Sequence, residues 1–373
     1  MNNTKQISEL FDYQPKSGRK AGDGLGEGLF PFYTSGQTQS KYLNIHDFEG
    51  DSLVLGTGGK PSVHFATGKF SATNDCFVIK PKNEDEIHPK YLYYYFLSKM
   101  YLLENGFRGA GLKHLSRSYF NDLPIPIFDY HTSQLRIIDI LDKADELRQK
   151  RKESIKLLVD YLRSTFLEMF GDPLLNKNNF MVKELKDVVQ DDKIVTYGIV
   201  QAGPDIENGV PYIKTSNIVN NQISLDGLSR TSKEIANKYE RSKVSYGDLI
   251  ISIRATVGTI AELPKELDGA NLTQGTARIS PGGEVNKYFL LNLIRSNGMQ
   301  TWLKSQVKGA TFKEITLTRL REMPIILPPI DLQNKLADIV HQVEKVKAKY
   351  NESERELDNL FGSLMQRAFK GEL

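Results

Sequence analysis

The sequence predicts an α+β fold in which two globular domains with small twisted β-sheets are joined by two long helices that form an antiparallel coiled coil. Two observations favour this fold class. The chain repeats the same order of segments at a distance of about 200 residues. In each copy, a segment of β-type residues with turn-forming Gly, Pro, Asn and Asp precedes a long segment in which apolar residues have helical spacing.

The clearest part of the repeat lies at residues 106–147 and 306–346. Both stretches run from a Gly-Ala turn through a lysine and a proline-rich piece into a helical pattern. Such a duplication is typical of a protein that performs one task at two places. The matched residues are Gly109 with Gly309, Lys113 with Lys313 and Pro124 with Pro324, each pair 200 residues apart, and Gln134 with Gln333 after a one-residue slip.

The first segment of each copy, residues 1–128 and 174–327, is predicted to form a mixed α+β domain. Short β-type runs such as SLVLGTGG, CFVIK, DLIISIRATVG and TARIS are separated by turn residues. The order of motifs is similar in the two segments, but the residues between the motifs differ. We therefore expect one scaffold that carries two different sets of surface residues.

The second segment of each copy, residues 129–173 and 328–373, is predicted to contain one long helix. Gln134 to about Phe170 contains neither proline nor glycine, and Leu332 to Ala368 contains only Gly362. The preceding pieces LPIPIF and MPIILPP cannot continue a helix, so they set where each helix begins. About 35 helical residues extend for roughly 50 Å, and a single apolar stripe of that length needs a partner. We expect the two helices to pair antiparallel, although each could instead pack only on its own domain.

Composition narrows the class of protein. The chain has 373 residues, of which 39% are hydrophobic, and a net charge of +3 from 49 basic and 46 acidic residues. This predicts a folded chain of two or three domains in which local patches, not overall charge, would bind an anionic partner. Cys76 is the only cysteine, which excludes intrachain disulfides and Cys-based zinc sites. No signal peptide or membrane span is recognisable, so we expect a soluble cytoplasmic protein.

Motifs for catalysis and cofactor binding are incomplete. GTGGK at residues 56–60 resembles a phosphate-binding loop, but Val54 stands where the first glycine belongs, and Pro61 follows the lysine. The six histidines lack metal-ligand spacing, and no Gly-x-Ser-x-Gly motif is present. Pro204-Asp205 is not followed by the Asp-x-Lys or Glu-x-Lys of a nuclease metal site. We therefore predict no catalytic residue, no metal site and no cofactor site.

The polar loop residues that remain are those of a nucleic-acid reader. Arg makes bidentate contacts with guanine, Asn and Gln with adenine, and Lys, Ser and Thr bind phosphate. Each candidate could equally be an ordinary solvated residue, but Lys113 and Lys313 follow a Gly-Ala turn at the same point of both copies. The predicted DNA-binding residues are Tyr33, Thr34, Ser35, Thr57, Lys60, Asn74, Arg108, Lys113, Lys214, Thr215, Ser216, Asn217, Arg254, Thr256, Asn271, Gln274, Lys308, Thr311 and Lys313.

Together these motifs resemble the specificity subunit of type I restriction-modification systems over nearly the whole chain. The resemblance rests on the order domain, helix, domain, helix. It also rests on the sequences GDLIISIRATVG, LTQGTARI, MPIILPPIDLQNKLADIV and AFKGEL. In the first domain, PFYTSG, GTGGKPSVHF and TGKFSATNDCFVI look like another subtype of the same recognition domain.

The resemblance implies that each globular domain is a target recognition domain for one half of an interrupted, asymmetric double-stranded DNA sequence. The helices would set the spacing of the half-sites and dock two methyltransferase subunits, which carry S-adenosylmethionine and methylate adenine. Motor-nuclease subunits, which use ATP and Mg²⁺, would join the complex for cleavage. The chain itself would bind no cofactor and catalyse no reaction.

Two other functions stay open at this point. A self-contained DNA methyltransferase or nuclease can carry a similar recognition domain, but it needs a cofactor loop and a catalytic Pro-Pro-aromatic motif, and the sequence has neither. A two-headed coiled-coil adaptor that binds proteins would explain the helices but not the basic, amide-rich loops.

Overall fold

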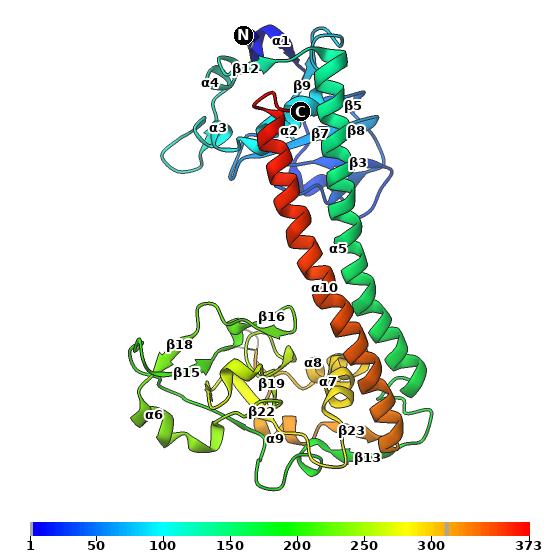
Figure 1. Ribbon diagram of the computed structural model, residues 1–373, viewed down its shortest axis with the longest axis vertical. Helices are drawn as coiled ribbons and strands as arrows, with labels where there is room; N and C mark the ends of the chain where they lie inside the picture. Colours follow the sequence, from blue (N-terminus) through cyan, green and yellow to red (C-terminus); the bar gives the residue numbers. More distant parts are fainter. Residues whose placement is uncertain (1–2, 310–312) are drawn as a thin grey trace. The chain divides into compact units, whose positions relative to one another are not determined.

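The computed structural model describes residues 3–309 and 313–373, and the chain divides into two compact units (Figure 1). Unit 1 consists of residues 1–153 and 351–373, and unit 2 consists of residues 154–350. Each unit combines small β-sheets and short helices with part of each long helix. The predicted α+β fold class with two long helices is confirmed.

Unit 1 is built mainly from short strands, with short helices between them. Its strands are β1 (Asn3–Gln6), β2 (Phe11–Tyr13), β3 (Phe30–Tyr33), β4 (Lys41–Leu43), β5 (Phe48–Glu49), β6 (Ser52–Gly56), β7 (Ser62–Ala66), β8 (Lys69–Ala72), β9 (Cys76–Pro81), β10 (Phe107–Arg108), β11 (His114–Leu115) and β12 (Pro124–Ile127). Its short helices are α1 (Ile7–Leu10), α2 (Pro89–Ser98), α3 (Tyr101–Glu104) and α4 (Arg117–Asn121).

The strands of unit 1 form two four-stranded sheets. The first has the order β2-β9-β6-β7 with antiparallel neighbours, and the second has the order β4-β3-β8-β5 with β3 and β8 parallel. Strand β6 is buried along its whole length, in keeping with its apolar run Leu53-Val54-Leu55. Strands β1 and β12 pair antiparallel, as do β10 and β11.

Unit 2 repeats this arrangement. The sheet β14-β22-β19-β20 corresponds to β2-β9-β6-β7, and in the sheet β18-β15-β21 the pair β15-β21 is parallel, like β3-β8. Strands β13 and β23 pair like β1 and β12. The strands are β13 (Met181–Glu184), β14 (Thr196–Tyr197), β15 (Val210–Ile213), β16 (Ile218–Val219), β17 (Gln222–Ile223), β18 (Ser229–Thr231), β19 (Leu249–Ser252), β20 (Ile260–Glu262), β21 (Asn271–Leu272), β22 (Thr276–Ile279) and β23 (Pro324–Leu327). The short helices are α6 (Lys233–Lys238), α7 (Lys287–Arg295), α8 (Asn297–Ser305) and α9 (Leu317–Arg321).

The long helices α5 (Leu135–Phe170) and α10 (Ile330–Ala368) contain 36 and 39 residues and run antiparallel. In unit 1 the beginning of α5 packs with the end of α10. Arg148 of α5 donates a hydrogen bond of 2.7 Å to Asp358 of α10, and its guanidinium lies 4.3 Å from the ring centroid of Phe361. The charged pair and the aromatic contact fix the register of the two helices in this unit.

In unit 2 the end of α5 packs with the beginning of α10. Phe166 and Phe170 of α5 share one hydrophobic core with Leu336 and Val340 of α10. The ring of Phe170 also meets that of Phe289 in α7, at a centroid distance of 4.9 Å. The long helices are therefore part of the core of the domain that adjoins them.

A buried glutamine holds the beginning of α5 against unit 1. Nε2 of Gln134 donates to the carbonyl oxygens of Glu86 (2.8 Å) and Phe128 (2.9 Å), and its Oε1 accepts a hydrogen bond from the backbone N–H of His88 (3.0 Å). His88 caps the N-terminus of α2, because its Nδ1 accepts from the N–H of Lys90. One side chain thus links the start of the long helix to the start of α2.

Gln333 makes the matching contacts in unit 2. Its Nε2 donates to the carbonyl oxygens of Pro328 (2.8 Å) and Glu284 (3.3 Å), and its Oε1 accepts from the N–H of Asn286 (2.9 Å). Asn286 caps α7 as His88 caps α2. The match between the two glutamines in the sequence therefore has a structural cause.

Candidate nucleic-acid interface

Backbone hydrogen bonds gather four loops of unit 1 at one place. The N–H of Thr57 donates to the carbonyl of Asp75 (2.8 Å), that of Thr73 to Tyr33 (2.9 Å) and that of Leu115 to Thr57 (2.9 Å). These bonds connect segments that are far apart in the sequence. We call the assembled surface edge 1, and it consists of residues 33–36, 56–60, 73–76 and 108–114.

The same three backbone bonds recur in unit 2. The N–H of Ile253 donates to the carbonyl of Gly275 (2.9 Å), that of Thr273 to Ile213 (3.2 Å) and that of Ile315 to Ile253 (3.0 Å). They join the loops that correspond to those of edge 1. We call this surface edge 2, and it consists of residues 213–217, 252–258, 273–276, 308–309 and 313–314.

The turn after the central strand has a residue with positive φ at the same position of both edges. Gly59 and Ala255 occupy equivalent positions with φ of +80° and +56°. Glycine adopts this left-handed conformation freely, whereas alanine is strained in it. The N–H of Ala255 donates to the carbonyl of Lys313 (3.0 Å), which holds the turn. The preceding residue is Gly58 at edge 1 and Arg254 at edge 2, so one backbone carries different side chains.

Six of the predicted DNA-binding residues are exposed or half-buried at edge 1. The ammonium groups of Lys60 and Lys113 are exposed and have no hydrogen-bond or ion-pair partner among residues 3–309 and 313–373. Arg108 stacks over the ring of Tyr119, with its guanidinium carbon 5.5 Å from the centroid. The hydroxyl of Ser35 donates to the carbonyl of Asp75 (2.7 Å). The six residues are Thr34, Ser35, Lys60, Asn74, Arg108 and Lys113.

Eight predicted residues are exposed or half-buried at edge 2. Arg254 forms an ion pair of 2.9 Å with Glu314, and both side chains stay 43% exposed. Gln274 is half-buried, and its backbone N–H donates to the carbonyl of Ile199 (3.0 Å). Its carboxamide makes no hydrogen bond to any residue that the structure describes. The eight residues are Lys214, Thr215, Ser216, Arg254, Thr256, Gln274, Lys308 and Lys313.

Two predicted residues are buried in strands, whereas Arg108, at the end of β10, is exposed. Tyr33 ends β3 and is 8% exposed. Asn271 begins β21 and is 2% exposed, and its Nδ2 donates to the carbonyls of Ala236 and Tyr239, each at 3.3 Å. The expectation of loop positions is wrong for both. Their side chains are buried in the domain that they belong to.

Two further predicted residues lie in turns but are buried. The hydroxyl of Thr57 donates to the carbonyl of Asp75 (2.8 Å). Oδ1 of Asn217 accepts from the N–H of Lys214 (2.9 Å) and caps a short helical turn. Both side chains stabilise the loops of the edges through hydrogen bonds to the backbone. The remaining predicted residue, Thr311, lies outside the described residues.

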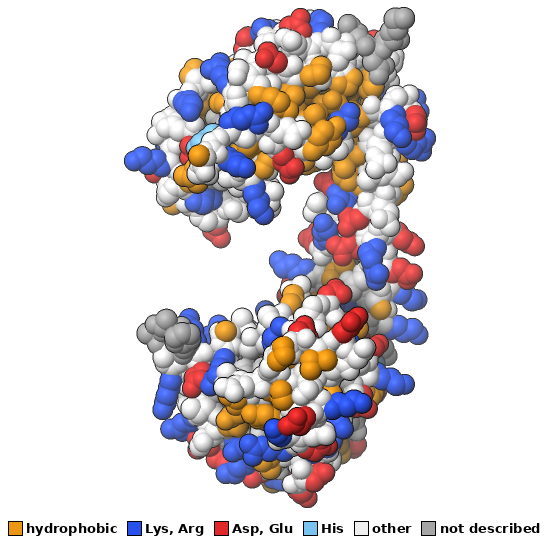
Figure 2. Space-filling view, turned by 90° about the vertical axis from the view of Figure 1, so that its left-hand side faces the viewer, with side chains coloured by type: hydrophobic (Ala, Val, Ile, Leu, Met, Phe, Trp, Pro, Cys, Tyr) orange, Lys and Arg blue, Asp and Glu red, His pale blue; other side chains and the backbone are white. Residues whose placement is uncertain are grey.

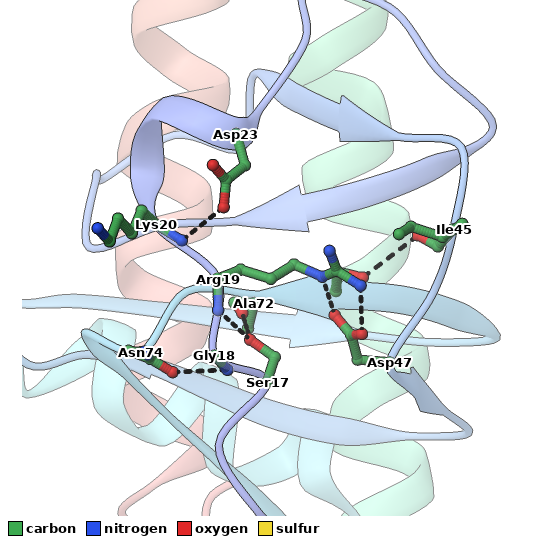
Figure 3. A network of polar contacts seen from close by, with 10 residues as sticks. Ser17, Gly18, Arg19, Lys20, Asp23, Ile45, Asp47, Ala72 and Asn74 are labelled. Carbon is green, nitrogen blue, oxygen red and sulfur yellow. Dashed lines mark hydrogen bonds and ion pairs between the residues drawn. The ribbon is translucent and has the colours of Figure 1, made fainter.

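Sequence reasoning missed a basic loop beside edge 1, the stretch KSGRK (Figure 3). Oδ1 of Asn74 accepts from the N–H of Gly18 (2.8 Å), and the N–H of Asn74 donates to the carbonyl of Arg19 (3.0 Å). The guanidinium of Arg19 turns toward Asp47 and, through its hydrogen bonds, lowers the pKa of that carboxyl. Lys20 points away from this pair and is exposed. The signal was three cations within a glycine-rich stretch.

Charge is distributed locally and not as one continuous basic surface. Figure 2 shows Lys and Arg side chains interspersed with Asp and Glu along the helices and over both units. Within the described part of the chain, no group of three or more His, Cys, Asp or Glu side chains could hold a metal ion. None of the described helices is long and apolar enough to cross a membrane.

Comparison with known proteins gives one consistent similarity. A family model described as the type I restriction modification DNA specificity domain matches residues 2–157 and 177–357. The chain is 25% identical to the specificity subunit of the type I restriction enzyme EcoBI of Escherichia coli, over 91% of this chain and 77% of that protein. It is 23% identical to the MjaVIII specificity subunit of Methanocaldococcus jannaschii, over 88% of this chain and 83% of that protein.

Solved structures share the fold. The crystal structure of a type I restriction-modification S subunit from M. genitalium superposes with a TM-score of 0.61 at 17% identity, covering 98% of this chain and 96% of that chain. A chain from a study of complex assembly and conformational transition of a type I system superposes with a TM-score of 0.51 at 16% identity, covering 100% and 98%. The order of domains and long helices is therefore shared with known S subunits.

Proposed function

The chain belongs to the type I restriction-modification DNA specificity family, and we propose that it directs a type I complex to an interrupted, asymmetric DNA sequence. Edge 1 reads one half of the target, and edge 2 reads the other half. The chain itself supplies recognition and no catalytic group.

The observation that carries this proposal is one backbone with two sets of side chains. Three backbone hydrogen bonds that join the loops of edge 1 have direct counterparts at edge 2. Base identity is read by the side chains that a scaffold presents to the groove, so different side chains favour different bases. A palindromic target would require similar side chains at both edges. The matched positions that differ include Gly58 with Arg254, Asn74 with Gln274, Asp75 with Gly275 and His114 with Glu314.

The exposed residues divide by chemistry into phosphate and base contacts. The lysines Lys60, Lys113, Lys308 and Lys313 bind phosphates, because their ammonium groups are exposed and unpaired within the described structure. Arg254 is held in orientation by Glu314 and is suited to the bidentate contact with guanine. Each such contact discriminates against a wrong base by about 1–3 kcal/mol.

The free carboxamide of Gln274 is suited to adenine by the same bidentate geometry. Thr34, Ser35, Asn74 and Arg108 of edge 1, with Lys214, Thr215, Ser216 and Thr256 of edge 2, complete the proposed set. Tyr33, Thr57, Asn217 and Asn271 are left out of it because they are buried.

The long helices set the spacing of the half-sites and dock the partner subunits. At about 1.5 Å per residue, helices of 36 and 39 residues extend for roughly 55 Å, which is about 16 base pairs at 3.4 Å each. Exposed apolar side chains on these helices, such as Leu157 (59%), Tyr161 (53%) and Leu360 (49%), offer surface to two methyltransferase subunits. Those subunits hold S-adenosylmethionine, and motor-nuclease subunits hold ATP and Mg²⁺.

The test is to map methylated adenines in the host genome with and without the gene for this chain. The expected result is an interrupted, asymmetric motif whose methylation disappears with the gene. A palindromic motif would overturn the two-half-site reading. Methylation by the purified chain alone would favour a self-contained methyltransferase, and salt-independent protein association without DNA binding, even with methyltransferase subunits present, would favour an adaptor.

A further inference from the structure

The loop between β10 and β11 carries a side chain whose exposure the fold does not explain. Leu112 is 84% exposed, the largest value of any large hydrophobic side chain in the described residues. An apolar side chain in water contributes no burial to the stability of its own domain. Single exposed leucines are common on protein surfaces. Exposure alone therefore does not indicate a role for Leu112, and its surroundings have to be considered.

The loop is closed tightly and attached to edge 1. Arg108 and His114 pair across the antiparallel ladder at its base, and His114 also forms a bridge with Gly58. Gly109 has a φ of +134°, and a Cβ at this position would lie 2.7 Å from the carbonyl oxygen of Leu112. Only glycine allows this close approach. The apolar tip is therefore held by the backbone of the surface that we assign to DNA.

Along the chain, cations precede and follow the apolar tip. Arg108 precedes Leu112 at the base of the loop and is held over the ring of Tyr119. Lys113 follows it directly, and Lys60 lies in the neighbouring loop, and both lysines are exposed. Cations that grip phosphates on either side of a single apolar side chain are the arrangement with which proteins insert a wedge into DNA. A protein partner would require a wider apolar surface than one side chain.

We propose that Leu112 is an apolar wedge that enters the base stack of the half-site bound by edge 1 and unstacks one base step. This inference rests on the proposed function, because it requires edge 1 to bind DNA. The wedge makes recognition depend on how easily a step opens, so flexible pyrimidine–purine steps are favoured at that position. The sequence places Phe312, another large apolar residue, 200 positions later, outside the described residues.

The experiment uses the full chain with its methyltransferase subunits and duplexes of the mapped target. Each duplex carries 2-aminopurine at one position of the half-site other than the methylated adenine, because this base fluoresces more strongly when it is unstacked. The wild-type complex should raise the fluorescence at one step. Leu112→Ala should abolish the rise and weaken specific binding about tenfold, the effect of a typical single mismatch. Leu112→Phe should preserve both, and an abasic site at that step should restore binding by Leu112→Ala.

Leu175→Ala is the matched control, because Leu175 is 66% exposed and lies in the turn after α5. It should alter neither fluorescence nor affinity. Failure of the wild-type complex to bind the target would overturn the proposed function and the wedge together. If the wild-type complex binds and Leu112→Ala keeps both its affinity and its fluorescence change, the wedge alone is overturned. An unchanged melting temperature of Leu112→Ala would confirm that the loss is not one of folding.

Discussion

Unit 1 and unit 2 attach a long helix to a recognition domain in the same way, through Gln134 in one and Gln333 in the other. Both glutamines are at most 1% exposed, and each satisfies one backbone N–H and two carbonyl groups. An unsatisfied buried polar group is expensive, so the scaffold strongly restricts these positions. Similarity between the units is greatest where a side chain completes the backbone.

The edges differ in whether a matched side chain also satisfies the backbone. Asn74 and Gln274 lie at the same point of the two edges, but only the carboxamide of Asn74 accepts a hydrogen bond from a neighbouring loop, at Gly18. The carboxamide of Gln274 has no such partner in the described structure. The same position thus supports the neighbouring loop in unit 1, whereas in unit 2 its carboxamide keeps its full hydrogen-bonding capacity for the proposed DNA contact. The two units therefore share a scaffold but differ in the side chains on its surface.

The largest effect is expected when the length of the two long helices, and with it the proposed spacing of the two recognition domains, is changed. Deletion of residues 150–156 from α5 and 350–356 from α10 removes one heptad from each helix, or about 10 Å. At about 3.4 Å per base pair, the spacer of the methylated motif should shorten by roughly three base pairs, or recognition should be lost. Adenine methylation mapping measures either result. Retention of the original motif with its original spacer would contradict the spacing role of the helices.

The matched glutamines provide the next largest effect. Gln134→Leu and Gln333→Leu should each lower the free energy of unfolding of their own unit by about 3 kcal/mol, because three backbone groups, most of them half-buried, lose their partners at roughly 1 kcal/mol each. Hydrogen exchange of the full chain in urea reports the two units separately. Gln37→Leu, at an exposed position of unit 1, is the control. A large loss for only one glutamine would show that the two helix starts are not equivalent.

The fold was largely predictable, because local residue patterns determine its main elements. The expected helix from Gln134 to Phe170 begins one residue later and ends at Phe170, where Gly171 with a φ of +72° ends it. Helix α10 begins at Ile330, two residues before the expected Leu332, because the prolines that precede it suit the first helical turn. Where proline and glycine define the boundary, sequence spacing is sufficient.

The site was less predictable, because contacts between distant loops decide which polar side chains are free. Asn271 is of a residue type suited to reading adenine, but its amide nitrogen already donates to the carbonyls of Ala236 and Tyr239. The side-chain oxygen of Asn74 already accepts a hydrogen bond from Gly18, which lies 56 positions away. Lys20 was missed because it belongs to none of the repeated motifs of the sequence, although the structure exposes it beside edge 1. Residue type predicts what each side chain could bind, but tertiary contacts decide which of the predicted side chains are accessible.

A smaller effect concerns the matched lysines. Lys113→Ala and Lys313→Ala should weaken DNA binding several-fold and similarly, because each removes one proposed phosphate contact. The slope of log K against log salt should fall by about 0.9 for each substitution. Binding titrations at several salt concentrations measure this slope. Lys177→Ala, an exposed lysine in the turn after α5, should leave it unchanged. An unchanged slope for Lys113→Ala or Lys313→Ala would remove that lysine from the phosphate contacts.

The smallest expected difference between the units is their response to mild acid. Burial lowers the pKa of His64 and of His88, both in unit 1, and Nε2 of the neutral His64 ring donates to the carbonyl of Gly36 (2.9 Å). The matching strand of unit 2, β20 (Ile260–Glu262), has no histidine. Because these pKa values are lower in the folded chain than in the unfolded chain, the unfolded state binds protons first as the pH falls below about 6.5.

Unit 1 should therefore lose more stability than unit 2 between pH 7.5 and pH 5.5, a range that lies above the titration of ordinary carboxyl groups. Hydrogen exchange at both pH values, corrected for the intrinsic exchange rate, separates the two units. His64→Gln retains a donor for Gly36 without a titrating ring, so it should reduce the difference between the units. Equal losses in both units, or a difference that His64→Gln leaves intact, would assign the acid response to other groups and remove His64 from the contrast.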